Sequence, residues 1–123
     1  MSDRRPLGLL VLSGVRHAAS YLPIFDAHPD VALRALCEEA DAPEWARRDT
    51  RLLAERHGVP CTTDPAAALA RDDVDLVLVC SEPTRHARLA AQALRAGKHV
   101  LMDKPMATTL DERAMPAAAA PGA

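Results

Sequence analysis

Short apolar runs alternate with longer amphipathic runs along the whole of this chain. The apolar runs contain few polar residues, a composition that is typical of strands buried on both faces of a sheet. The fourth run is also the richest in β-branched residues, which favours an extended backbone. The pattern predicts strands at Leu7–Ser13, Val31–Cys37, Val59–Cys61, Val74–Cys80 and His99–Met102.

The amphipathic runs carry the residues that begin and end helices. Asp41 and Asp64 are candidate N-caps, and each is followed within two residues by a proline. Gly58 and Gly97 suit the left-handed residue that follows a helix. The pattern predicts helices at Val15–His28, from Asp41 to His57, from Asp64 to about Arg71, from a Thr84 cap to Ala96, and from the capping box Thr109–Glu112 onward.

Strands and helices in strict alternation, joined by short connections, predict an α/β fold. Its sheet is expected to be doubly wound and parallel, with about five strands in a Rossmann-like order. A chain of 123 residues has room for one domain, which we assign to residues 1–112. Residues 113–123 are expected to form a frayed tail, because Pro116 would break the last helix and the rest is Ala, Pro and Gly.

Composition narrows the class of protein. Hydrophobic residues make up 49% with a single Phe, Tyr and Trp, so the core must be aliphatic. The net charge of −2 provides no basic field for nucleic acid or anionic lipid. Three cysteines without a C-x-x-C pair predict buried reduced thiols, neither a disulfide framework nor a metal site. The run Leu7–Leu12 is shorter than an export signal, and no segment approaches the roughly 20 residues that span a bilayer, which predicts a cytoplasmic protein.

Candidate chemistry lies after the strands, because ligands of open parallel sheets bind beyond the carboxyl ends of the strands. The window Leu12-Ser13-Gly14-Val15-Arg16-His17 stands where dinucleotide-binding proteins carry G-x-G-x-x-G, and it keeps the middle glycine alone. An ordinary strand-to-helix turn explains that glycine as well as a phosphate site does. If the site binds phosphate, Arg16 could replace part of the lost backbone contacts.

Glu38 ends the second strand, 24 residues beyond Gly14, close to the ~20 expected of an acidic residue that binds ribose hydroxyls. A carboxylate there accepts two hydroxyl hydrogen bonds and repels a 2′-phosphate, so NAD is favoured and NADP stays an alternative. A solvated charge at a strand end is the other interpretation. Glu39 is one residue out of register and is the weaker candidate.

The five histidines show no ligand spacing, so structural or solvated roles are expected. Lys104 lies between Asp103 and Pro105, just past the fifth strand, where a short rigid loop could hold its ammonium over a cleft. By spacing alone, it would be a surface lysine.

The stretch Ala96-Gly97-Lys98-His99-Val100-Leu101-Met102-Asp103-Lys104-Pro105 closely resembles the A-G-K-H-V-x-x-E-K-P signature of the Gfo/Idh/MocA family. That family includes glucose–fructose oxidoreductase and inositol dehydrogenase. The run from Asp73 to Cys80 is similar to the family's fourth strand, and His86 falls where its loop-to-helix histidine falls. The segment Glu55–Pro60 matches its A-x-x-x-G-V segment, so the similarity runs from about Leu7 to Glu112.

The resemblance implies an N-terminal NAD(P)-binding Rossmann domain of a two-domain enzyme that acts on sugars or cyclitols. It implies that Lys104 is catalytic and hydrogen-bonds the reacting oxygen as negative charge develops there. A general acid/base would come from the second domain. The residues predicted to bind the cofactor are Ser13, Gly14, Arg16, Glu38, Ser81, Glu82, His86, Asp103 and Lys104.

Four residues depart from the family pattern. Leu12 and His17 replace the outer glycines, Asp103 replaces a glutamate, and Glu82 replaces a proline. The substrate domain would follow Glu112, so we expect the chain to be incomplete as a catalyst alone. A non-catalytic nucleotide-binding remnant, an interaction module and one half of a split enzyme remain alternatives. The fifth strand would be an apolar edge open to self-association or to a partner chain.

Overall fold

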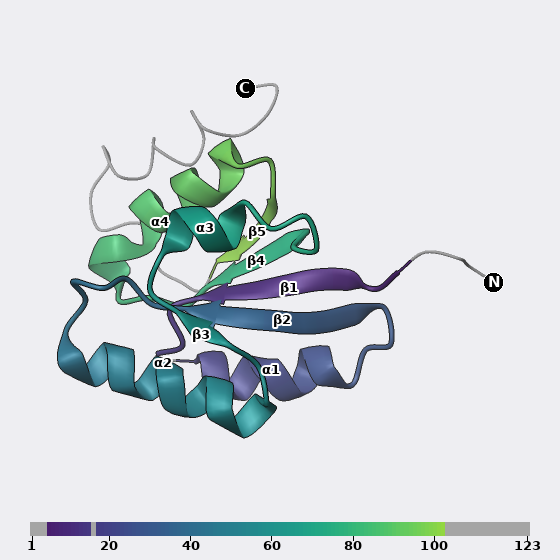
Figure 1. Ribbon diagram of the computed structural model, residues 1–123, viewed down its shortest axis with the longest axis horizontal. Helices are drawn as coiled ribbons and strands as arrows, with labels where there is room; N and C mark the ends of the chain where they lie inside the picture. Colours follow the sequence, from purple (N-terminus) through teal and green to yellow (C-terminus); the bar gives the residue numbers. More distant parts are fainter. Residues whose placement is uncertain (1–4, 16, 103–123) are drawn as a thin grey trace.

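The computed structural model describes residues 5–15 and 17–102, which form a single parallel sheet between two layers of helices (Figure 1). The strands are β1 (Leu7–Leu12), β2 (Val31–Cys37), β3 (Cys61–Thr62), β4 (Leu76–Val79) and β5 (His99–Met102). The helices are α1 (Ala18–Asp26), α2 (Glu44–His57), α3 (Pro65–Leu69) and α4 (Pro83–Arg95). The strand order β3-β2-β1-β4-β5, with every pair parallel, confirms the predicted doubly wound α/β fold.

Alternate residues of the central strand face opposite layers of helices. Leu9 and Val11 of β1 are fully buried in a cluster with α1 and α2, whereas Leu10 and Leu12 are buried in a cluster with α3 and α4. Figure 1 shows these two pairs of helices on opposite faces of the sheet. The strands are therefore covered on both faces, which explains why they appear in the sequence as unbroken apolar runs.

The element boundaries differ from the prediction at the end of the first strand and at two helix starts. The first strand ends at Leu12, because Ser13 turns into the left-handed region with φ 70°. The predicted caps Asp41 and Thr84 are wrong, since Pro43 and Glu82 occupy the N-cap positions of α2 and α4. In α4 a proline stands at the first helical position, where its missing N–H costs nothing.

Other boundaries follow the prediction. Asp64 caps α3 by accepting a hydrogen bond from the backbone N–H of Ala67 at 3.2 Å. Gly58 and Gly97 follow α2 and α4 with φ of 67° and 81°. The helix predicted from Thr109 and the tail at residues 113–123 lie outside the described residues.

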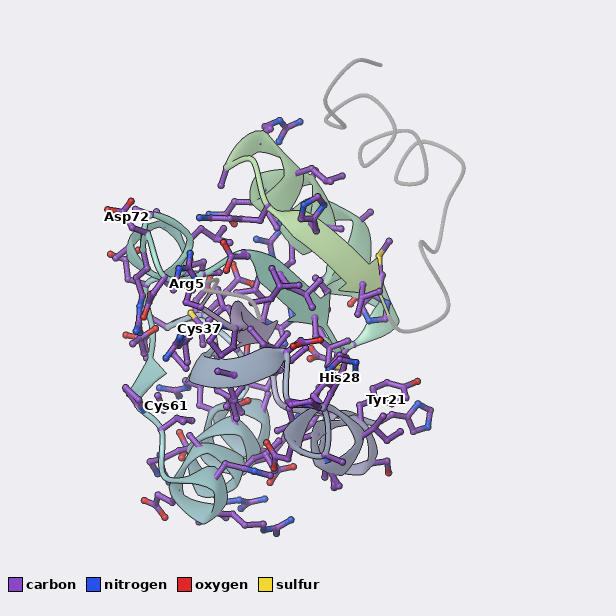
Figure 2. All side chains as sticks on the ribbon, turned by 90° about the vertical axis from the view of Figure 1, so that its right-hand side faces the viewer. Arg5, Tyr21, His28, Cys37, Cys61 and Asp72 are labelled. Atoms are coloured by element: carbon purple, nitrogen blue, oxygen red, sulfur yellow. The ribbon has the colours of Figure 1, made fainter. Side chains whose placement is uncertain are left out.

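The cysteines do not share one environment. Cys37, at the end of the inner strand β2, is buried, and burial raises the pKa of its thiol to about 11. Cys61, on the edge strand β3, is exposed, which corrects the expectation that all three thiols are buried. Figure 2 labels both residues and shows Cys61 farther out than Cys37.

The amino edge of the sheet is held by an arginine from the N-terminal segment. Arg5 donates to both oxygens of Asp75, at 2.7 and 3.0 Å, and to the carbonyl oxygen of Asp72 at 3.0 Å. Figure 2 views this edge, with Arg5 beside Asp72. The candidate site lies at the opposite edge of the sheet, where the strands end.

Candidate functional site

The carboxyl edge of the sheet brings together side chains that are far apart in the sequence. Ser13 follows β1, Glu38 follows β2, and Ser81 and Glu82 follow β4. Because β1 lies between β2 and β4, the turn at Ser13 is flanked by the other two loops. This is the edge at which open parallel sheets bind ligands.

The turn after β1 is tied to the end of β2. Ser13 is buried, and its backbone N–H donates to the carbonyl oxygen of Cys37 at 2.7 Å. Its hydroxyl donates to Oε2 of Glu38 at 2.5 Å. Ser13 is the one non-glycine residue with positive φ among the described residues, and this backbone conformation costs about 1–2 kcal/mol for an L-residue. The two hydrogen bonds hold the strained turn in place.

Gly14 packs closely against β2 and α2. A Cβ built on Gly14 would lie 3.0 Å from Cδ2 of Leu36 and 3.2 Å from Cα of Thr50. The backbone N–H of Gly14 donates to Oγ1 of Thr50 at 2.9 Å, and Thr50 in turn donates to Oε2 of Glu38 at 3.4 Å. The glycine predicted to approach a phosphate therefore contacts a helix of its own chain, and its N–H already has an acceptor.

Glu38 is buried, with a relative exposure of 2%. It was expected to offer its carboxylate to ribose hydroxyls, yet both oxygens already accept hydrogen bonds from the protein. Oε1 accepts from the backbone N–H of Glu39 at 2.9 Å and from Nη1 of Arg85 at 2.6 Å. Oε2 accepts from Ser13, Thr50 and, at 3.3 Å, from Nη2 of Arg85.

Arg85 is the residue at this edge that the sequence analysis missed. It belongs to the first turn of α4. Its guanidinium also pairs with Glu82, and Nε of Arg85 lies 3.1 Å from Oε2 of Glu82. Although burial opposes its charge, the hydrogen bonds that Arg85 donates to Glu38 and Glu82 raise its pKa further above the ordinary value. The spacing of Glu82 and Arg85, three residues apart at a helix start, was the one available signal.

Glu39 and Arg88 form a second ion pair beside the first. Nη1 and Nη2 of Arg88 lie 2.7 and 2.8 Å from the two carboxylate oxygens of Glu39. The hydrogen bonds from Arg88, assisted by Arg85, outweigh partial burial and hold the pKa of Glu39 below its ordinary value. Burial alone would raise the pKa of Glu82, but Arg85 lowers it overall.

The remaining predicted site residues divide into two groups. Ser81 and His86 are buried at the start of α4, and the hydroxyl of Ser81 donates to the carbonyl oxygen of Glu82 at 3.2 Å. Arg16, Asp103 and Lys104 lie outside the described residues. The last described residue, Met102, pairs in register with Val79, which pairs with Leu12, so the chain leaves β5 at the same edge of the sheet.

The described residues show neither a metal-ligand cluster nor a membrane-spanning helix. Within residues 5–15 and 17–102, no three His, Cys, Asp or Glu side chains are grouped as metal ligands would be. None of the helices in the same part of the chain has the length and apolar character needed to cross a membrane.

Comparison with known proteins finds the same family at the level of sequence and of structure. A model of the oxidoreductase family Gfo/Idh/MocA, described as an NAD-binding Rossmann fold, matches residues 11–121. A glycosyl hydrolase family 109 protein of Saccharopolyspora erythraea is 39% identical over 76% of this chain and 21% of that protein. A dTDP-3,4-didehydro-2,6-dideoxy-alpha-D-glucose 3-reductase of Actinomadura kijaniata is 38% identical over 71% of this chain and 24% of that protein.

Solved structures agree with these relatives. GenD2 from gentamicin A biosynthesis, in complex with NAD, superposes with a TM-score of 0.81 at 31% identity and covers 98% of this chain and 33% of its own. The 3-ketoreductase KijD10 from Actinomadura kijaniata, in complex with NADP, gives a TM-score of 0.78 at 31% identity over 94% of this chain and 36% of its own. The chain thus spans about a third or less of the length of these proteins.

Proposed function

Because this chain belongs to the oxidoreductase family with an NAD-binding Rossmann fold, we propose that it is the dinucleotide-binding portion of an oxidoreductase. The proposed reaction is hydride transfer between a nicotinamide and a sugar- or cyclitol-like carbinol or carbonyl. The observation that carries the proposal is a hydrogen bond between the turn after β1 and the acid that follows β2. The hydroxyl of Ser13 donates to Oε2 of Glu38 at 2.5 Å. In such folds the dinucleotide binds at the switch point between β1 and β4, with its pyrophosphate at the β1 turn and a ribose hydroxyl on an acid about 20 residues further on.

The residues at this edge have distinct proposed roles. Glu38 would accept the hydroxyls of the adenosine ribose, and the turn at Ser13 and Gly14, with Arg16, would face the pyrophosphate. Ser81, Glu82, His86 and Asp103 would lie toward the nicotinamide, which supplies or accepts the hydride when it is bound. Lys104 would hydrogen-bond the reacting oxygen of the substrate and stabilise its developing charge.

NAD is the proposed cofactor, because the carboxylate of Glu38 lies where the adenosine ribose would bind. Glu39 follows it in the chain and adds a second carboxylate, and both pair with Arg85. A 2′-phosphate is repelled by a carboxylate at this position and lacks the free hydroxyl that the carboxylate binds. NADP is expected to bind more weakly than NAD.

Titration of the purified chain with NAD, NADP and adenine nucleotides tests the proposal by calorimetry. NAD is expected to bind with a dissociation constant below ~1 mM, about −4 kcal/mol. The matched variant Glu38→Gln keeps the size of the side chain and is expected to weaken NAD binding about tenfold, since a hydrogen bond to a charged group contributes about 1.5–3 kcal/mol. If no dinucleotide or nucleotide binds below ~1 mM, the proposed function is wrong.

A second candidate is a non-catalytic remnant or interaction module that keeps the fold and has lost the cofactor. Two observations favour it, namely that the N–H of Gly14 bonds Thr50 and that Glu38 bonds Arg85. The same titration separates the two candidates, since the remnant would bind no dinucleotide. One half of a split enzyme would bind NAD alone and reduce substrate only with a partner chain, for which the open edge of β5 is the proposed contact. The cytoplasmic location predicted from composition is part of both candidates.

A further inference from the structure

Arg85 bridges two loops on either side of β1. From the first turn of α4 its guanidinium reaches Glu38 at the end of β2, with Nη1 2.6 Å from Oε1 and Nη2 3.3 Å from Oε2. On its other side Nε lies 3.1 Å from Oε2 of Glu82, which follows β4. We call the set Glu38, Arg85 and Glu82 the Arg85 bridge. It spans the end of β1, where the proposed dinucleotide would run.

The Arg85 bridge leaves Glu38 no acceptor capacity. A carboxylate offers about four lone-pair sites. Glu38 already receives hydrogen bonds from the hydroxyls of Ser13 and Thr50, from its neighbour's N–H, and from two nitrogens of Arg85. The first three donors are built into the local fold, whereas Arg85 arrives on a long side chain. A ribose diol can therefore reach Glu38 only by displacing Arg85.

Displacement would take from Arg85 the carboxylate that accepts from two of its nitrogens. Its side chain is 12% exposed, and burial penalises a guanidinium that has lost a partner. Glu82 would remain on one side of the guanidinium, and Glu39 would remain 3.2 Å from Nη1. A phosphate oxygen could replace Glu38 on the other side, because the planar fork of arginine binds phosphate and carboxylate alike.

We propose that Arg85 is a specificity-determining residue of the dinucleotide site, which admits ligands that carry both a ribose diol and a phosphate and rejects nucleosides. The proposal rests on the proposed function, because it assumes that Glu38 binds a ribose. A nucleotide supplies the diol to Glu38 and the phosphate to Arg85, so both ends of the broken pair are satisfied. A nucleoside supplies the diol and offers Arg85 no anion in place of Glu38.

The test compares adenosine, ADP-ribose and NAD as ligands of the wild-type chain and of Arg85→Met. Calorimetry is expected to give at least fivefold tighter adenosine binding for the variant, because Glu38 is then free to accept the diol. ADP-ribose and NAD are expected to bind no tighter than to the wild type, since they lose the cation. The ratio of the dissociation constant for adenosine to that for ADP-ribose or NAD should therefore be at least fivefold smaller in the variant than in the wild type.

Arg88→Met is the matched control. Arg88 lies three residues after Arg85 in α4, pairs with Glu39 and is 53% exposed, so its loss is expected to leave the preference for phosphate within twofold of the wild type. If Arg85→Met fails to fold, as judged by circular dichroism, Arg85→Lys replaces it. A single ammonium cannot bond both carboxylates in a fork, so adenosine should again bind at least threefold tighter.

The outcomes separate this proposal from the proposed function. If the wild type binds NAD and a folded Arg85 variant binds adenosine no tighter than the wild type does, the role of Arg85 is wrong and the cofactor site stands. If neither the wild type nor the variants bind any of the three ligands below ~1 mM, the proposed function is wrong and this inference is overturned with it.

Discussion

Nη1 of Arg85 lies 2.6 Å from Oε1 of Glu38, so the first turn of α4 is joined to the end of β2 across the end of β1. The pair is largely buried, with side-chain exposures of 12% and 1%. Such a pair fixes the positions of two loops whose sequence separation is 47 residues. Ser13, which follows β1, also donates to Glu38, and it is the subject of the first prediction.

Replacing Ser13 separates the strain of its turn from the hydrogen bond it makes. Both Ser13→Ala and Ser13→Gly lose the hydroxyl that donates to Glu38. Only glycine relieves the left-handed backbone at φ 70°. Ser13→Gly is therefore expected to be about 1 kcal/mol more stable than Ser13→Ala in urea unfolding. Equal stability of the two variants, or a more stable alanine variant, would contradict the strained turn.

Three glycines should respond very differently to a methyl group. A Cβ on Gly8 would lie 1.6 Å from the carbonyl oxygen of Asp73, so two backbone segments must separate. A Cβ on Gly14 meets Leu36 and Thr50 at 3.0 and 3.2 Å, and a Cβ on Gly97 meets nothing within 4 Å.

In urea unfolding we expect Gly14→Ala to cost about 1–3 kcal/mol and Gly8→Ala to cost more. Gly97→Ala should cost about 1 kcal/mol, from its positive φ alone. If Gly8→Ala were the mildest of the three variants, the packing of β1 against the loop before β4 would be wrong.

The sequence predicted the order of strands and helices because each carries its own periodic signal. The strand His99–Met102 and the cap at Asp64 are local features, set by neighbouring residues, and both are confirmed. The sequence also placed Ser13 and Glu38 at one edge, since the carboxyl ends of parallel strands lie together. What it could not predict is the bond between Glu38 and Arg85. That bond depends on how far α4 sits from β2, and no local pattern encodes a distance between elements so far apart in the chain.

The same reasoning explains Gly14. A single glycine after a first strand suggested close approach to a phosphate, and the structure shows that Thr50 of α2 approaches it closely. Glu82 stands where the family pattern has a proline, but the sequence did not show that its carboxylate pairs with Arg85. The contacts of Gly14 and Glu82 depend on where α2 and α4 lie, and the sequence alone does not give those positions.

Acid should remove the contribution of Glu39 to stability. Arg88 holds the folded-state pKa of Glu39 below its ordinary value of 4.5. The ionised form therefore stabilises the fold above pH 4.5, and this contribution is lost as the pH falls through the folded-state pKa. Because Arg88 is half exposed, the contribution should be about 1 kcal/mol or less.

Urea unfolding of the wild type and of Glu39→Gln between pH 7 and pH 2.5 measures this effect. The difference in unfolding free energy is expected to be constant above pH 5.5 and to shrink below about pH 4.5, the ordinary value for a glutamate. A difference that stays constant down to pH 2.5 would show that the ion pair with Arg88 does not contribute.

The open edge of β5 should make the chain self-associate. In the described part of the sheet β5 pairs with β4 alone, and its Leu101 is 43% exposed. Beside it a hollow of about 250 Å³ is lined by apolar side chains, namely Tyr21, Ile24, Phe25, Leu78, Leu101 and Met102. An unpaired strand edge next to apolar surface is a template for pairing with a second chain.

Sedimentation velocity at several concentrations tests this association with Leu101→Lys as the variant. The wild type is expected to sediment faster as its concentration rises, and the lysine at the edge should shift it toward the monomer, because a charged edge resists pairing. Leu52→Lys is the matched control, since Leu52 is 49% exposed on α2, away from this edge, and its replacement should leave the association unchanged. A wild type that stays monomeric at every concentration, or a Leu52→Lys variant that dissociates as fully as Leu101→Lys, would show that β5 is not the contact.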